Sequence, residues 1–136
     1  MGTLDGKTAI VTGGGGCGMG SAISRQFAAE GAAIVISDID AESAERVAAD
    51  IRTQGGRALA VPTDVSNAGE VERMVERAVA EFGRIDVLAN HAGIRSGGPI
   101  EQMTEAQWDR ALGIHLKSAF LCSRATVLHG WGVQTR

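Results

Sequence analysis

Hydrophobic residues follow two different patterns along the chain, and each pattern predicts one type of secondary structure. Four short runs are apolar at almost every position, as in parallel strands that are covered by helices on both faces. These runs are residues 9–12, 33–37, 57–62 and 85–89. Between them and after the last one, apolar residues recur at the spacing of amphipathic helices. The helical segments begin near Ser21, Asp40, Asn67 and Thr104, and a further one covers about residues 114–128.

The alternation of strands and helices predicts an α/β fold with a doubly wound parallel sheet. Right-handed crossovers between parallel strands place helices on both faces of such a sheet. Two helix starts are marked by capping pairs, Asn67 with Glu70 and Thr104 with Gln107. At 136 residues, the chain has the length of one domain.

Charge and composition argue against several kinds of partner. The formal net charge of −3 gives no basic surface that would attract nucleic acid or an anionic membrane. No stretch approaches the ~20 apolar residues of a membrane span, and residues 1–7 contain no apolar run that could serve as a signal peptide. The two cysteines, Cys17 and Cys122, do not make a disulfide framework. We therefore expect a cytoplasmic protein with no nucleic-acid partner, no membrane partner and no metal.

A glycine-rich turn, residues 13–20, separates the first apolar run from the first helix. Glycine adopts positive φ without strain, and its missing Cβ lets a pyrophosphate approach the free N–H groups at a helix N-terminus. The turn is therefore a candidate phosphate site. A glycine-rich loop without a ligand is the alternative interpretation, because such a pattern alone is weak evidence.

Further candidate residues follow the other strands at their carboxyl ends, where ligands bind in folds of this class. Asp38 lies roughly 20 residues after the glycine turn, where a carboxylate can accept hydrogen bonds from the ribose hydroxyls of a dinucleotide. Because such a carboxylate repels a 2′-phosphate, NAD(H) is favoured over NADP(H). The alternatives are that Asp38 is only a neighbour of the helix cap Asp40, that Asp64 is a turn residue, and that Asn90 satisfies backbone groups between strands.

Taken together, several segments resemble the N-terminal half of the short-chain dehydrogenase/reductase family. They are residues 4–13, the glycine turn, Asp38, Asp64 with Val65, and residues 90–93, which read Asn-His-Ala-Gly. The resemblance extends from Leu4 to about Ala125. It implies a single, incomplete NAD(P)-binding Rossmann domain over residues 1–136, with strand order 3-2-1-4 and truncation after about four strands.

The same resemblance implies a role for each matching residue. The glycine turn would hold the pyrophosphate, Asp38 the ribose, and Asp64 with Val65 the adenine, while the Asn-x-Ala-Gly segment would support the sheet and line the cofactor. The residues implied in cofactor binding are Gly14, Gly18, Met19, Gly20, Asp38, Asp64, Val65, Asn90, Ala92 and Gly93.

Two positions depart from the family pattern. The turn has one residue more than the usual TGxxxGxG, and the GxxxGxG pattern is recovered only from Gly14, so we expect a longer loop that still binds pyrophosphate. His115 stands where the family has a catalytic-site asparagine. Its two nitrogens could hold the same water, or His115 could be a partly buried helical residue. His91 and His129 are expected to be structural or surface residues.

A third departure concerns the mechanism. Members of this family use a tyrosine and a lysine spaced YxxxK, but the chain contains no tyrosine, and its only lysines are Lys7 and Lys117. Residues 127–136 also leave the family pattern. We therefore expect a truncated NAD(H)-dependent oxidoreductase, related to enzymes that move hydride between a secondary alcohol or ketone and the cofactor, with little or no activity of its own. The alternatives are a non-catalytic dinucleotide-binding or interaction module and an inert fragment. A homo-oligomer is a further possible assembly.

Overall fold

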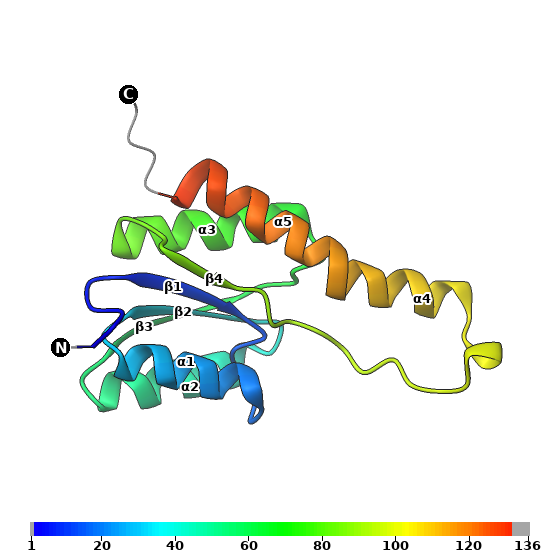
Figure 1. Cartoon of the computed structure of the whole chain (residues 1–136), viewed down its shortest axis with the longest axis horizontal. Helices are drawn as coiled ribbons and strands as arrows, with labels where there is room; N and C mark the ends of the chain where they lie inside the picture. The colour runs from blue at the N-terminus through cyan, green and yellow to red at the C-terminus, as the bar shows by residue number, and fades with distance from the viewer. Residues whose placement is uncertain (1, 132–136) are drawn as a thin grey trace.

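A computed structural model, which describes residues 2–131, shows one parallel four-stranded sheet between two layers of helices (Figure 1). The strands lie in the order β3-β2-β1-β4, as the family resemblance implies. Their bounds are β1 Thr8–Thr12, β2 Ala33–Asp38, β3 Arg57–Pro62 and β4 Val87–Ala89. All three strand pairs are parallel. The predicted α/β fold with a doubly wound sheet is therefore confirmed.

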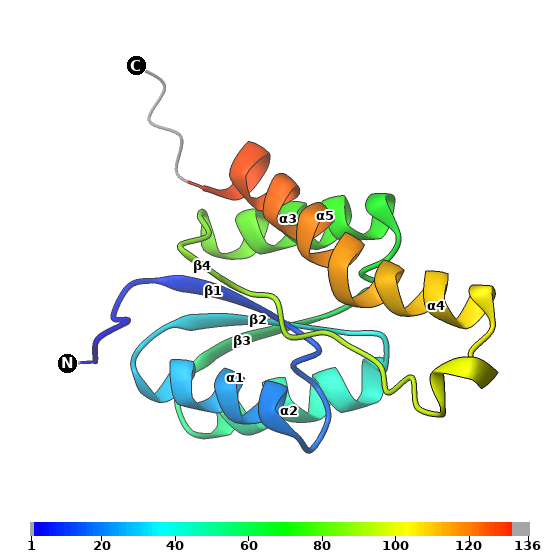
Figure 2. The same cartoon turned by 45° about the vertical axis from the view of Figure 1, so that its right-hand side comes forward.

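The helices cover both faces of the sheet. Helices α1 (Met19–Ala29) and α2 (Ala41–Thr53) lie on one face, and α3 (Ala68–Phe82) and α5 (Ser118–Ala125) lie on the other (Figures 1 and 2). Successive side chains of each strand point to opposite faces, so each inner strand contributes to two cores. In β1, Ile10 packs with the α3 and α5 side, whereas Ala9 and Val11 pack with the α1 and α2 side. This explains why the strands are apolar at successive positions.

Local signals mark the helix ends where the sequence predicts them. The Asn67 side chain accepts the N–H of Glu70 at 3.1 Å and caps α3. Thr104 and Gln107 form a reciprocal capping box at the start of α4 (Glu105–Leu112). At the other end of α3, Gly83 adopts a left-handed conformation with φ of 83°, which glycine takes without strain and which ends the helix.

Two boundaries differ from those predicted. Helix α1 begins at Met19 rather than Ser21: Gly18 is its N-cap, and Met19 and Gly20 already belong to its first turn. Strand β4 begins at Val87 rather than Ile85, because the N–H of Ile85 donates to the carbonyl of Gly130 at 2.8 Å and Ile85 pairs with Trp131 in a single bridge. Within the described residues, no second strand pairs with that outer edge of β4.

The two helices predicted after Thr104 are joined into one. Helix α4, the π-helical turn η2 (Gly113–Lys117), α5 and the π-helical turn η3 (Thr126–Gly130) follow one another without a break, after the short 3₁₀ turn η1 (Ile100–Gln102). Gly113 does not interrupt this long helix, because its φ of −59° and ψ of −42° are right-handed helical values. In Figure 1, α4 extends beyond the edge of the sheet. No helix in residues 2–131 is long and apolar enough to cross a membrane.

Met74 on α3 provides a test of the core between the sheet and α3. Its side chain is fully buried in this core, so Met74→Ala should lower the free energy of unfolding by about 2–5 kcal/mol through lost burial and a residual cavity. Urea denaturation followed by circular dichroism measures the change. The matched control is Glu76→Gln, an exposed position on the same helix, which should change the value by less than about 0.5 kcal/mol. Equal losses of unfolding free energy in the two variants would contradict the burial of Met74 in this core.

The uncovered edge of β4 provides a second test. The N–H of Asp86 donates to the carbonyl of Thr8 on β1 at 2.8 Å, and N–H groups alternate in direction along a strand. The Leu88 amide should therefore face β1 and exchange slowly with deuterium, while the amides of Val87 and Ala89 face the outer edge and exchange faster. Residue-resolved hydrogen exchange by NMR measures this, and equal protection at all three positions would show that the edge is covered.

Candidate functional site

A cleft of about 620 Å³ opens at the carboxyl ends of the strands. Its size is within the range of ligand sites, roughly 300–1,000 Å³. It is lined by the glycine turn after β1 and by the segments that follow β2, β3 and β4, and the long helix closes one side. Seven of the predicted site residues line this cleft: Met19, Asp38, Asp64, Val65, Ala92, Gly93 and His115.

The glycines of the turn fall into two groups: some pack closely against neighbouring residues, and others line the cleft. The N–H of Gly14 donates to the carbonyl of Ser37 at 3.1 Å, and a Cβ on Gly14 would lie 2.9 Å from Ser24 Oγ. A Cβ on Gly20 would overlap the carbonyl oxygen of Gly13. Gly14 and Gly20 are thus needed for the contact between the turn and α1, and they do not line the cleft. The glycines that do line it are Gly13 and Gly16.

The N-terminus of α1 is at the end of this turn. Gly18 is the N-cap residue, and no side chain caps the helix, so the first N–H groups of α1 have no partner within the helix. These groups, together with the helix dipole, favour an anion. Gly18 is exposed and lies outside the cleft lining, whereas Met19 is part of the lining. Residues 16–18 form the exposed outer part of the turn.

Asp38 is held against the glycine turn by two backbone hydrogen bonds. Its Oδ2 accepts the N–H of Gly15 at 3.0 Å, and its Oδ1 accepts the N–H of Asp40 at 3.1 Å. A Cβ on Gly15 would lie 3.0 Å from Oδ2, so glycine permits this close approach. Helix capping is performed by Asp40, which accepts the N–H groups of Glu42 and Ser43. An ionised carboxylate has about four acceptor sites, and Asp38 therefore retains acceptors for a ligand in the cleft.

Asp64 combines a turn role with a place in the cleft. Its Oδ1 accepts the N–H of Ser66 at 2.9 Å and the Ser66 hydroxyl at 2.6 Å. These bonds favour the ionised carboxylate and lower the pKa of Asp64, to which the charge of Arg110 also contributes. The N–H of Asp64 donates to Glu70 Oε2 at 2.6 Å. Asp64 thus forms the turn before α3 and also lines the cleft beside Val65.

The segment after β4 is fixed by Thr12, whose importance the sequence did not reveal. Thr12 Oγ1 accepts the N–H groups of His91 and Ala92, each at 3.1 Å. Asn90 turns the other way, and its side-chain amide donates to Ser123 Oγ on α5 at 3.3 Å. Ala92 and Gly93 therefore line the cleft, while Asn90 does not. The sequence offered one signal for this role, because Thr12 is the last residue of β1, the strand that pairs with β4.

Both histidines near the cleft have defined surroundings. His115 Nε2 lies 2.8 Å from the carbonyl oxygen of Ile94, and its ring packs on Gly93, where a Cβ would lie 2.6 Å from Cε1. His115 therefore connects the long helix to the segment after β4 while it lines the cleft. His91, which the sequence suggested to be structural or superficial, also lines the cleft, and its buried Nδ1 has no hydrogen-bond partner within residues 2–131.

Two further lining residues, Gly13 and Gly16, belong to the predicted glycine turn. The other lining residues were not selected from the sequence, because their places depend on how the segments come together. They are Ile39, Thr63, His91, Ile94, Arg95, Arg110 and Ile114. The cleft thus combines a helix terminus without a side-chain cap, a carboxylate at the end of β2 and an apolar wall. Within the described part of the chain, no group of three or more histidine, cysteine, aspartate or glutamate side chains could hold a metal ion.

Comparison with known proteins gives consistent matches over nearly the whole chain. The family model described as short chain dehydrogenase matches residues 7–130. The (2S)-[(R)-hydroxy(phenyl)methyl]succinyl-CoA dehydrogenase subunit BbsD of Thauera aromatica is 37% identical over 98% of this chain and 52% of its own length. D-threitol dehydrogenase of Mycolicibacterium smegmatis is 40% identical over 90% of this chain and 46% of its own length.

Solved structures agree with this result. A 7α-hydroxysteroid dehydrogenase in complex with NADH and 7-oxo glycochenodeoxycholic acid is 36% identical, with a TM-score of 0.87 over 93% of this chain and 49% of that one. A short chain dehydrogenase from Mycobacterium smegmatis has a TM-score of 0.90 at 35% identity, over 95% of this chain and 54% of that one. The chain spans about half the length of the relatives it matches. It belongs to the short-chain dehydrogenase/reductase family.

Proposed function

We propose that this chain binds a nicotinamide dinucleotide in the cleft at the strand ends and prefers NAD(H) to NADP(H). The observation that carries the proposal is the Asp38 carboxylate, which is held at the end of β2 against the glycine turn by the N–H of Gly15. Family membership and the complex of the similar 7α-hydroxysteroid dehydrogenase with NADH support the cofactor class. The preference between the two dinucleotides rests on Asp38.

The charge of Asp38 gives the preference its physical basis. Its free acceptor sites suit the 2′- and 3′-hydroxyls of an adenosine ribose, and its negative charge opposes a 2′-phosphate. Hydrogen bonds to a charged group contribute about 1.5–3 kcal/mol, which corresponds to a preference of about ten- to hundredfold.

The other segments would hold the remaining parts of the cofactor. The pyrophosphate would lie over the turn at Gly13 and Gly16 and at the start of α1 near Met19, with Gly14, Gly18 and Gly20 giving the turn its shape. Asp64 and Val65 would contact the adenine, and Ala92 and Gly93 the nicotinamide half.

We further propose that the chain contributes the cofactor-binding part of an oxidoreductase acting on a secondary alcohol or ketone. A bound nicotinamide supplies hydride transfer. The proton transfer that accompanies it needs an acid–base group, which is worth about 10²–10⁴ in rate. The chain has no tyrosine, and His115 Nε2 is engaged with the carbonyl of Ile94. We therefore expect the 136-residue chain to bind the cofactor with little or no turnover.

Asp38→Asn tests the cofactor preference. The substitution keeps the side-chain size but removes the charge, so the Kd for NADH should rise about ten- to hundredfold, while the Kd for NADPH should stay the same or fall. Isothermal titration calorimetry measures both constants. Glu76→Gln removes one exposed carboxylate from α3, away from the cleft, and should change neither. If the Asp38 variant and the parent chain bind NADH equally, the proposed role of Asp38 is wrong.

Turnover of the 136-residue chain tests the second proposal. We expect NADH to raise the melting temperature, because a ligand that binds only the folded state stabilises it. The chain with NAD and a panel of secondary alcohols should give no protein-dependent increase in NADH absorbance. An NADH-forming rate that is proportional to protein concentration, and that Asp38→Asn reduces, would show that the chain carries its own acid–base group.

A further inference from the structure

A second pocket lies beside the cleft, between the segment that follows β4 and helix α4. Its volume is about 370 Å³, which is within the range of ligand sites, roughly 300–1,000 Å³. The pocket and the cleft are adjacent, because they share three lining residues, Ile94, Arg95 and Arg110. We call it the arginine pocket and define it by Ile94, Arg95, Pro99, Met103, Gln107 and Arg110.

The charge of the arginine pocket is positive. Arg95 and Arg110 contribute two guanidinium groups, and none of the described residues that line the pocket is an aspartate or a glutamate. Neither arginine forms an ion pair within residues 2–131. By contrast, Lys7 and Arg84 line a pocket that also contains Asp86, and both pair with its carboxylate. The arginine pocket therefore carries two positive charges that its own lining does not neutralise.

A contact of His115 fixes the two segments that carry these arginines. His115 Nε2 lies 2.8 Å from the carbonyl oxygen of Ile94, the residue before Arg95. Arg110 lies five residues before His115 on the long helix. The contact thus ties the segment of Arg95 to the helix of Arg110 next to the pocket. A ligand between the two guanidinium groups would not have to bring these segments together, and such preorganisation lowers the cost of binding.

One carboxylate in the cleft acts on Arg110 from a distance. Hydrogen bonds from Ser66 lower the pKa of Asp64, and the positive charge of Arg110 also contributes. Asp64 and Arg110 nevertheless form no ion pair in the described part of the chain. Oδ1 of Asp64 is occupied by the N–H and the hydroxyl of Ser66, while a guanidinium group has five N–H donors. Arg110 therefore keeps donors for a ligand in the arginine pocket.

We propose that the arginine pocket binds the anionic end, a carboxylate or a phosphate group, of the molecule whose alcohol or ketone group reacts in the cleft. Guanidinium groups bind such oxyanions through paired N–H donors. The side chains of Ile94, Pro99 and Met103 supply apolar surface for the carbon chain of that molecule. The reaction in this inference rests on the proposed function, but the binding of an anion in the pocket does not require the cofactor.

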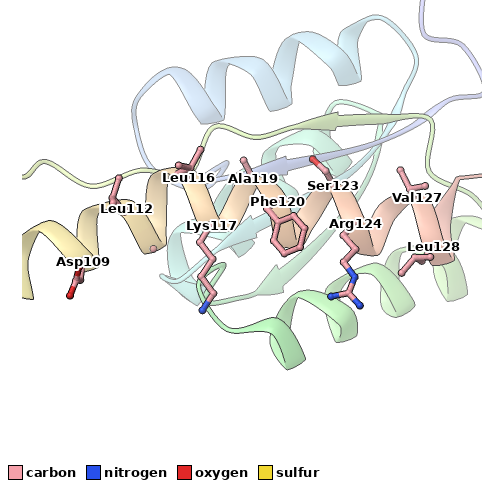
Figure 3. A pocket seen from close by; sticks show the side chains of 11 residues that line it. Asp109, Leu112, Leu116, Lys117, Ala119, Phe120, Ser123, Arg124, Val127 and Leu128 are labelled. Carbon is pink, nitrogen blue, oxygen red and sulfur yellow. The ribbon is translucent and has the colours of Figure 1, made fainter.

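A second groove, which runs along the long helix, has a different charge pattern (Figure 3). Asp109 lines it together with Lys117 and Arg124, and Leu116 and Phe120 are its large exposed apolar side chains. Because this groove contains a carboxylate among its cations, an anion should prefer the arginine pocket. The groove therefore serves as an internal reference in a binding experiment.

An NMR titration of the isotope-labelled 136-residue chain tests the proposal without cofactor. The probes are butyrate, butyl phosphate and butyramide, which has the skeleton of butyrate without its charge. The backbone and guanidinium N–H signals of Arg95 and Arg110 should shift, with a Kd about tenfold lower for the tighter anion than for butyramide. The tighter anion identifies the group as a carboxylate or a phosphate. Signals of Lys117 and Arg124 should move little.

Substitution of each arginine locates the site. Arg95→Gln and Arg110→Gln should each raise the Kd of the tighter anion about two- to fivefold. The double substitution should remove the difference between this anion and butyramide. Arg77→Gln changes an exposed arginine of α3 that lines neither the cleft nor the pocket, and this matched control should leave the Kd unchanged. Circular dichroism checks the folding of each variant, which we expect because Arg95 and Arg110 are exposed.

Three outcomes would overturn the proposal. Both anions might bind no more tightly than butyramide, which would show that the pocket does not select charge. Anion selectivity that survives the double substitution would place the site elsewhere on the chain. Displacement of the anion by saturating NADH would assign the two arginines to the cofactor and not to a substrate. Anion binding by a chain that does not bind NADH would support the pocket and contradict only the cofactor proposal.

Discussion

The close approach of the glycine turn to the ends of β1 and β2 is the constraint on which the site depends. Gly14 donates to the carbonyl of Ser37 at 3.1 Å, and Gly15 donates to the carboxylate of Asp38 at 3.0 Å. A side chain at either position would push the turn away from β2. The same contacts set the start of α1, so one set of backbone hydrogen bonds positions both the open helix terminus and the carboxylate that faces the cleft.

Most of the fold could be predicted from the sequence because its signals are local. Burial on both faces produces continuous apolar runs, and caps such as Asn67 act within one helical turn. The start of β4 could not be predicted, because Ile85 pairs with Trp131, far away in sequence. Gly113 was equally ambiguous, since glycine occurs both in helix interiors and at helix ends. Its right-handed helical φ and ψ in the structure show that it lies within a helix here.

The positions of candidate site residues could be predicted where the end of a strand fixes them. They could not be predicted where they depend on hydrogen-bond partners in distant segments of the chain. Asp38 follows a strand directly, so its place at the mouth of the cleft was expected. Asn90 also follows a strand, yet it faces Ser123 on α5, a contact that depends on helix packing. His115 was selected for its position in a family pattern, and the structure adds its contact with the carbonyl of Ile94. The role of Thr12 became visible only with its hydrogen bonds to the segment after β4.

The most direct test of cofactor binding in this cleft is an NMR titration of the isotope-labelled chain with NADH. We expect the largest amide shifts at Gly15 and Gly16 of the turn, at Asp38, and at Ala92 and Gly93. Amides around Glu76 on α3, away from the cleft, should move little. Shifts that are absent at saturating NADH, or that occur only away from the strand ends, would contradict cofactor binding at the strand ends.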